Sequence, residues 1–428
     1  MKRKGFKLMK KIASLFISIL LLSTSSAFAL SPMQNTFDNL EKFISNYVIP
    51  REDKTPPVQS EKVILGNERL LSEYSNLIRG KKLGLVTNQT GVDSNMVKTV
   101  NKLYNYKEAE LTAIYSPEHG LDGKVLAGQY VDSYVDKTLN LPVYSLYGKT
   151  REPSKAMVEN VDVIIFDMQD IGSRTYTYMS TLNYVMRAGK KYSKPVIILD
   201  RPNPIGGNTV DGYIAQDKYL TFVGVDNLPL AHGMTSGELA QFFNRKIGAD
   251  ITVVPMDNYT RDMIWQDTGL KFVATSPKIP DIYSAFCYIA AGMGEGTSVG
   301  QDDYFKWVGS AGINSLEFAN KLNSSGLSGV NFSPETRGTR GGVRINITNF
   351  HKYNPVETSI YIISTANSMK TLTIPTEQNG VIPMFEKIWG GNKFGNALRN
   401  KWSAEKIIES YQNELNNFKS VREKYLIY

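Results

Sequence analysis

The sequence predicts an α/β fold: a doubly wound, mainly parallel sheet followed by a second, α+β domain. From about residue 62 to residue 255, short apolar runs alternate with helix-like stretches, which is the pattern of a parallel sheet covered by helices on both faces. From residue 256 to residue 428 the pattern changes to glycine-rich stretches, a predicted strand at 342–350 and a terminal helix. A length of 428 residues also suits two domains better than one.

Five apolar runs are the predicted strands of the first domain. They lie at 82–88, 110–116, 161–170, 194–203 and 251–257. The run VDVIIFDMQD at 161–170 gives the clearest signal, because it is continuous and rich in β-branched residues. Such a run is typical of a central strand that is covered on both faces.

Helix signals separate these runs and close the chain. Residues 181–192 repeat apolar side chains at helical spacing, and Thr235 with Glu238 forms a capping box ahead of a stop at Gly248. A final amphipathic helix is predicted behind Ser403 as its N-cap. Its apolar face would consist of Ile408, Tyr411, Leu415, Phe418, Val421 and Tyr425.

The first 29 residues have the pattern of a secretory signal. A basic start is followed by a short apolar run and by the small-residue ending Ala27-Phe28-Ala29. The alternative is a membrane anchor, but the apolar run is short for a span. We therefore expect a secreted protein with no membrane attachment after cleavage, and a polar, proline-containing linker at 30–61.

Charge and cysteine content exclude some functions. Six of the 49 basic residues and none of the 41 acids lie in the signal, so the net charge falls from +8 to +2 on cleavage. The remaining chain has no basic tract that would follow nucleic-acid phosphates, and no nucleic-acid partner is predicted. Cys287 is the single cysteine and lies in an apolar run, which indicates a buried residue and no internal disulfide.

Polar residues follow the predicted strands at the point where each strand ends. Because the carboxyl ends of parallel strands meet at one edge of a sheet, where ligands bind, these residues are the candidate site. In chain order they are Asn88, Glu118, His119, Gln169, Asp170, Arg174, Tyr176, Asp200, Arg201 and, somewhat later, His232.

This mixture of carboxylates, amides and aromatic rings suits a polyhydroxylated ligand, and the arginines suggest an anionic group on it. Two carboxylates on either side of a glycosidic bond can act as acid and as base or nucleophile. Each residue also has a structural alternative. The aspartates can cap helices or pair with the arginines, and the histidines can bind loop carbonyls.

Two further motifs lie beyond the predicted sheet. Glu295 lies between two glycines, where a ligand can approach the backbone closely, although a solvated loop glutamate is the alternative. Residues 296–300, GTSVG, match the nucleophile elbow around Ser298, with Asp302 or Asp303 and His351 following. No dinucleotide or phosphate-binding loop and no metal-ligand spacing is present, so we expect no cofactor and no metal.

Six segments, in this order, resemble the exo-β-N-acetylmuramidase family. They are SPEHG, LPVYSLYG, DMQDIGSRTYTY, LDRPNPIGG, HGMTSGELA and GEGT. The resemblance implies a Rossmann-like first domain without a nucleotide, an auxiliary second domain, and an active site in the cleft between them. It implies removal of terminal N-acetylmuramic acid from the non-reducing end of peptidoglycan fragments, muropeptides or disaccharides, in the cell-wall space.

The resemblance also assigns roles to residues. It implies Glu118 and Glu295 as the catalytic carboxylates and places Gln169, Asp170, Arg174, Tyr176, Asp200, Arg201 and His232 near the sugar. Glu118 is the expected acid, but the two roles can be exchanged, and the acetamido oxygen of the substrate can replace the nucleophile. After GEGT this chain has SVGQDDYFKWVG, which departs from many relatives at the rim of the pocket. The alternatives are a non-catalytic wall-binding protein and a serine esterase that uses Ser298.

Overall fold

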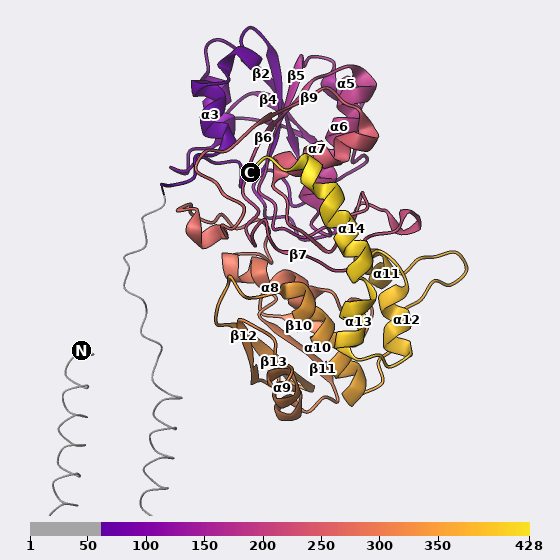
Figure 1. The fold of residues 1–428 in the computed structure, drawn as a ribbon. Coiled ribbons are helices and arrows are strands. Elements are labelled where there is room, and N and C mark those ends of the chain that lie inside the picture. Colours follow the sequence, from indigo (N-terminus) through magenta and orange to yellow (C-terminus); the bar gives the residue numbers. More distant parts are fainter. Residues whose placement is uncertain (1–60) are drawn as a thin grey trace, which may run out of the picture. The chain divides into compact units, whose positions relative to one another are not determined.

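The computed structural model describes residues 61–428 (Figure 1). The predicted signal at 1–29 and the predicted linker, except for its last residue, lie outside the described residues. None of the helices in the described part has the length and apolar character needed to cross a membrane.

The first domain contains a seven-stranded sheet in the order β3-β4-β2-β1-β5-β6-β9. All neighbouring strands are parallel except β3, which pairs antiparallel with β4 at one edge. The strands are β1 (Lys82–Thr87), β2 (Glu110–Ser116), β3 (Tyr134–Asp136), β4 (Leu141–Ser145), β5 (Val163–Asp167), β6 (Val196–Leu199) and β9 (Ile251–Val254). The predicted parallel α/β sheet is confirmed, and β3 and β4 are additional strands that the sequence reasoning missed.

Helices cover both faces of this sheet, as a doubly wound fold requires. The side chains of α3 and α4 share one apolar cluster with alternate residues of the strands, and those of α6 and α7 share the other. The helices are α3 (Gly66–Ser72), α4 (Thr99–Asn105), α5 (Lys155–Val158), α6 (Thr177–Tyr192) and α7 (Ser236–Ile247). The predicted limits of α7 are confirmed: the Thr235 side chain accepts a hydrogen bond from Glu238 N–H, and Gly248 ends the helix at φ +66°.

The second domain is built on a four-stranded antiparallel sheet in the order β10-β11-β13-β12. Its strands are β10 (Gly300–Asp302), β11 (Trp307–Ala311), β12 (Val330–Pro334) and β13 (Arg340–Ile347). Its helices are α8 (Ile282–Gly292), α9 (Ser315–Asn323), α10 (Pro355–Met369), α11 (Met384–Trp389), α12 (Lys393–Arg399), α13 (Ala404–Ser410) and α14 (Gln412–Arg422). The domain boundary at 255/256 stays a prediction.

Short segments complete the described chain. They are the two-stranded ribbon β7 (Val210–Asp211) and β8 (Ala231–His232) and the 3₁₀ turns Ser75–Leu77, Asp217–Tyr219, Trp265–Asp267 and Glu423–Tyr425.

The terminal helix differs from its prediction. Ser403 caps it as expected, but the helix breaks at Tyr411, whose hydroxyl donates to Asp211 across the chain. Beyond the break, α14 returns to the first domain (Figure 1), where Phe418 packs against Phe242 of α7 at 5.6 Å between ring centroids. The two domains therefore share one continuous apolar core.

Candidate active site

A cavity of about 520 Å³ lies beyond the carboxyl end of β2, between the sheet and the second domain. Its size falls within the range of small-molecule sites. The first domain contributes Glu118, His119, Leu126, Ala127, Gly128, Tyr147, Thr175, Tyr176, Thr177 and Val223 to its wall. The segments that follow β9 contribute Ser276, Pro277, Lys278, Ile279, Tyr288, Glu295, Gln301, Phe305, Met384 and Ile388.

Glu118 is positioned by the abrupt end of β2. Pro117 follows the strand, and a turn with His119 and Gly120 at positive φ directs the chain away from the sheet. The Glu118 carboxylate is 7% exposed and accepts two hydrogen bonds, from Gly128 N–H at 2.9 Å and from the Thr177 hydroxyl at 2.6 Å. Since Thr177 is the first residue of α6, the carboxylate also lies at a helix N-terminus, which attracts negative charge.

Glu295 reaches the same cavity from the turn that follows α8. Gly294 must stay a glycine there, because a Cβ would lie 2.5 Å from the carbonyl oxygen of Val299, and Gly296 has φ +79°. The turn closes through Thr297, whose N–H and hydroxyl both donate to the Gly294 carbonyl. The Glu295 side chain is exposed and has no hydrogen bond or ion pair within residues 61–428.

Tyr288 connects the two carboxylates electrostatically. Burial raises the pKa of its hydroxyl, and the nearby carboxylates of Glu118, Glu295 and Asp170 act in the same direction, so that the pKa is raised to about 12. All three acids therefore lie close enough to act on one phenol. Glu118 and Glu295 are far apart in the sequence and line the same cavity, while their catalytic roles stay a prediction.

Aromatic residues and His119 form part of the inner wall. Tyr176 lines the cavity and packs against Tyr178 at 4.9 Å and Tyr288 at 5.9 Å between ring centroids. The ring of His119 is held by a 2.7 Å contact between its Nδ1 and the Val125 carbonyl. Such rings supply apolar faces on which a sugar can pack.

Four other predicted residues lie in a buried polar layer and not in the cavity wall. Asp200 accepts hydrogen bonds from Arg201 N–H, Gly237 N–H, the Thr235 hydroxyl and the Tyr428 hydroxyl, and burial raises its pKa to about 7. Arg201 pairs with Asp167 at 2.6 Å. His232 Nε2 lies 3.1 Å from Asp170 Oδ2.

The remaining three are also held inside the protein. Arg174 donates to the backbone carbonyls of Tyr213, Leu228 and Ile388, and burial lowers its pKa to about 9. Gln169 donates to the carbonyls of Asp170 and Pro202. The Asn88 side chain caps the turn at Thr90.

The sequence suggests that Arg174 and Arg201 bind an anionic ligand. Their placement does not favour this role, because both guanidinium groups are almost fully buried against protein partners. Asn88 Nδ2, Gln169 Oε1 and Asp170 Oδ1 are buried polar atoms without a hydrogen-bond partner in the described chain. Contact of the residues in this layer with substrate stays a prediction. Sequence reasoning missed Thr177, Lys278 and Tyr288.

The serine esterase alternative lacks the necessary geometry. A nucleophile elbow places its serine between a strand and a helix. Ser298 instead precedes strand β10 and is exposed. His351 contacts Asp267, while Asp302 and Asp303 pair with arginines. Cys287 is buried, as expected, and burial raises its pKa.

Among residues 61–428, the histidine, cysteine and acidic side chains form no group of three that could hold a metal ion. The cavity wall thus contains two carboxylates in different surroundings, beside aromatic rings. Glu118 accepts two hydrogen bonds, and Glu295 is exposed to solvent.

Comparisons with known proteins show the family of the chain. A family model described as "Exo-beta-N-acetylmuramidase NamZ, N-terminal" matches residues 83–283, and one described as "Exo-beta-N-acetylmuramidase NamZ, C-terminal" matches residues 286–428. The "Peptidoglycan beta-N-acetylmuramidase NamZ" of Bacillus subtilis (strain 168) is 40% identical over 392 residues, which are 88% of this chain and 94% of that protein.

Two crystal structures of DUF1343 family proteins from Bacteroides fragilis NCTC 9343 have the same fold. One superimposes with a TM-score of 0.77 at 31% identity, and the other with 0.63 at 25%. Each comparison covers 86% of this chain and 99% of the other. On the matches across both domains and on the 40% identity, the chain belongs to the exo-β-N-acetylmuramidase NamZ family.

Proposed function

We infer that this chain is an exo-acting glycoside hydrolase that releases terminal, β-1,4-linked N-acetylmuramic acid from the non-reducing end of peptidoglycan fragments. The observation that carries this function is the meeting of Glu118 and Glu295 at one sugar-sized cavity in a chain of this family. Muropeptides or disaccharides from cell-wall turnover are the substrates.

The two carboxylates divide the reaction between them. Glu118, held in place by Gly128 and Thr177, donates a proton to the glycosidic oxygen as the bond to the sugar breaks. Glu295 acts on the opposite side, either on the incoming water or by orienting the acetamido group of the substrate, whose oxygen can attack the anomeric carbon. Tyr176 and Tyr288 supply the apolar wall for the ring.

The first experiment compares a chromogenic aryl β-glycoside of N-acetylmuramic acid with its N-acetylglucosamine counterpart. The wild type is expected to cleave the first and to leave the second nearly untouched; the reverse preference would show that the wrong sugar is assigned. On the natural disaccharide, Glu118→Gln should lower kcat by at least about 100-fold. Glu110→Gln, at the exposed opposite end of β2, is the matched control and should be unchanged.

A non-catalytic wall-binding protein remains the competing function, and the same preparation separates the two. A binding protein would retain disaccharide affinity in the wild type and in Glu118→Gln without releasing sugar from either. Release by the wild type alone supports the hydrolase.

The roles of the two acids can be told apart by the leaving group. A general acid matters when the departing oxygen is basic and matters little when it is already a stable anion. Glu118→Gln should therefore retain far more activity on a dinitrophenyl glycoside than on the natural disaccharide, whereas Glu295→Gln should lose comparable activity on both. The opposite pattern would exchange the roles.

Export to the cell-wall space is part of the proposal, since the substrate is found there and residues 1–29 have the signal pattern. Amino-terminal sequencing of the protein recovered from the culture medium or the wall should find Leu30 as the first residue. A chain recovered only from the cytoplasm and starting at Met1 would contradict it.

A further inference from the structure

The wall of the cavity includes a tight turn that presents a lysine. Ile279 N–H donates to the Ser276 carbonyl at 3.0 Å, which closes a four-residue turn with Pro277 and Lys278 at its centre. Proline in the first central position presets the backbone angle of such a turn. Lys278 is thus the side chain at the tip of a rigid turn, and it lines the cavity that contains Glu118 and Glu295.

The turn is fastened to the carboxyl end of the parallel sheet. Gln89, which follows β1, donates to the carbonyls of Ala274 and Thr275 at 2.8 and 2.9 Å. The Tyr176 hydroxyl donates to the Thr275 hydroxyl at 2.8 Å, and the Tyr178 hydroxyl donates to the Thr275 carbonyl. These anchors keep the turn at a fixed place relative to Tyr176, which lines the same cavity.

A second element, the turn between β10 and β11, borders Lys278. Its ammonium group lies 5.9 Å from the ring centroid of Tyr304, which is 43% exposed at the turn between β10 and β11. Asp303, Tyr304 and Phe305 all have φ between +49° and +68°. Three consecutive non-glycine residues in the left-handed region are costly, so the surroundings must hold this turn.

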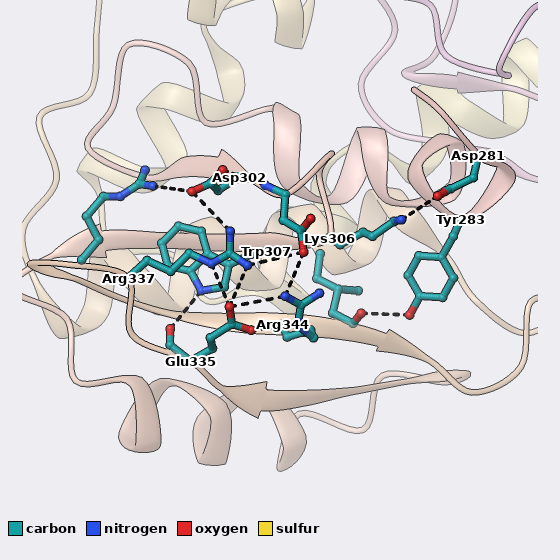
Figure 2. A network of polar contacts seen from close by, with 11 residues as sticks. Asp281, Tyr283, Asp302, Lys306, Trp307, Glu335, Arg337 and Arg344 are labelled. Carbon is teal, nitrogen blue, oxygen red and sulfur yellow. Dashed lines mark hydrogen bonds and ion pairs between the residues drawn. The ribbon is translucent and has the colours of Figure 1, made fainter. Parts of the chain in front are cut away.

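The surroundings are a network of ion pairs, shown in Figure 2. Arg344 pairs with Asp303 and with Glu335, both at 2.8 Å, and Arg337 pairs with Glu335 at 2.7 Å. Lys306, next to the strained turn, pairs with Asp281 at 2.6 Å. The network fixes Phe305 as part of the cavity wall and Tyr304 beside Lys278.

Within the described part of the chain, Lys278 itself has no carboxylate partner. It makes no hydrogen bond or ion pair within residues 61–428, whereas the lysine and three arginines around the neighbouring turn are all paired. Among the described residues that line the cavity, it is the one lysine or arginine. With Arg174 and Arg201 buried, the positive charge that an anionic ligand requires is supplied at the cavity wall by this residue.

We propose that Lys278 binds the lactyl carboxylate of N-acetylmuramic acid and thereby sets the preference of the enzyme for this sugar over N-acetylglucosamine. The inference rests on the proposed function, since the lactyl carboxylate is the charged group that distinguishes the two sugars. A lysine acts on it as a flexible point charge, and the exposed Tyr304 ring gives the lysine stem a surface along which to extend.

The test compares Lys278→Met with the wild type on three aryl β-glycosides: N-acetylmuramic acid, its lactyl methyl amide, and N-acetylglucosamine. A charge-assisted contact predicts a loss of about 10- to 100-fold in kcat/KM on the free acid, mostly through KM, and little change on the neutral amide. Lys278→Arg should recover part of the loss. Lys107→Met, in the exposed turn before β2 at the opposite end of the sheet, is the matched control.

Equal losses on the acid and on the amide would mean that Lys278 is merely structural, and no loss on either would mean that it does not bind substrate; each outcome overturns the inference. A substrate whose lactyl group carries L-alanine moves the carboxylate outward. If Lys278→Met lowers kcat/KM only on that substrate, the lysine recognises the stem peptide and the inference is wrong. Failure of the proposed function is distinct, because the wild type would then release no sugar from any substrate.

Discussion

The hydroxyl of Thr177 should be the main positioning group for Glu118. Thr177→Val keeps the shape of the side chain and removes the 2.6 Å hydrogen bond to Glu118 Oε2. A hydrogen bond to a charged group contributes about 1.5 to 3 kcal/mol. If that stabilisation holds the carboxylate in its reactive orientation, kcat should fall by about 10- to 100-fold, since about 1.4 kcal/mol corresponds to tenfold.

The chain provides a matched control on the same helix. The Thr181 hydroxyl lies one turn further along α6 and donates to the Thr177 carbonyl at 3.3 Å, away from the carboxylate. Thr181→Val should change kcat by less than about threefold on the scale of a weak local hydrogen bond. Thr177→Ser, which restores a donor, should recover most of the rate. The assay is steady-state release of N-acetylmuramic acid from the natural disaccharide, whose departing oxygen is basic, with thermal unfolding recorded for every variant.

Two results would refute this reasoning. If Thr177→Val and Thr181→Val lose the same activity, the effect comes from helix α6 and not from the contact with Glu118. If Thr177→Val is as active as the wild type, the Gly128 N–H and the Tyr147 side chain, which also interacts with Glu118, are sufficient to position the carboxylate.

Three further perturbations test other parts of the structure. Arg174→Met removes the hydrogen-bond donor of three buried carbonyls and should lower the free energy of unfolding in urea by about 3 kcal/mol. The KM of the folded variant should be unchanged, and a raised KM would indicate that Arg174 contacts the sugar. Gly294→Ala places a Cβ 2.5 Å from the Val299 carbonyl oxygen, so the turn must shift and kcat should fall through Glu295 while the melting temperature changes little; an unchanged kcat would remove Glu295 from the reaction. Burial raises the pKa of Asp200 to about 7. The folded state therefore keeps a proton on this carboxyl that the unfolded state releases near pH 4. The stability that this proton contributes to the folded state is lost as pH rises through 7. Unfolding of Asp200→Asn between pH 5 and 8 should therefore depend less on pH than unfolding of the wild type, and an identical dependence would assign the proton elsewhere.

The sequence was sufficient for the parts of the site that depend on local rules. Continuous apolar runs identified β1, β2, β5, β6 and β9, and the shared edge of parallel strands then brought Glu118 to the correct end of the sheet. Glu295 could be selected because it lies between two glycines, where a ligand can approach the backbone closely. Strands β3 and β4 were missed because both are short: β3 is a largely exposed edge strand, and β4 beside it is mostly half-buried and has a weak apolar pattern.

Long-range partners could not be read from the sequence. Arg174 has the residue type expected of a ligand for anions, but one of its partners is the carbonyl of Ile388, 214 residues away. Lys278 gave no signal, because a single lysine in a loop is usually a solvated side chain. The break at Tyr411 was invisible as well, since the apolar spacing continues through it, and only the tertiary contact with Asp211 explains it.

The return of α14 to the first domain has a consequence for how the molecule can be divided. Arg422 donates to the carbonyls of Gly207 and Gly233, and the Tyr428 hydroxyl bonds Met256 N–H and Asp200. A fragment that stops after β9 would leave the aromatic face around Phe242 bare, and it is expected to aggregate rather than fold. Chimaeras between relatives would therefore have to exchange α14 together with the first domain. Although α14 follows the second domain in the sequence, its side chains pack on the first domain.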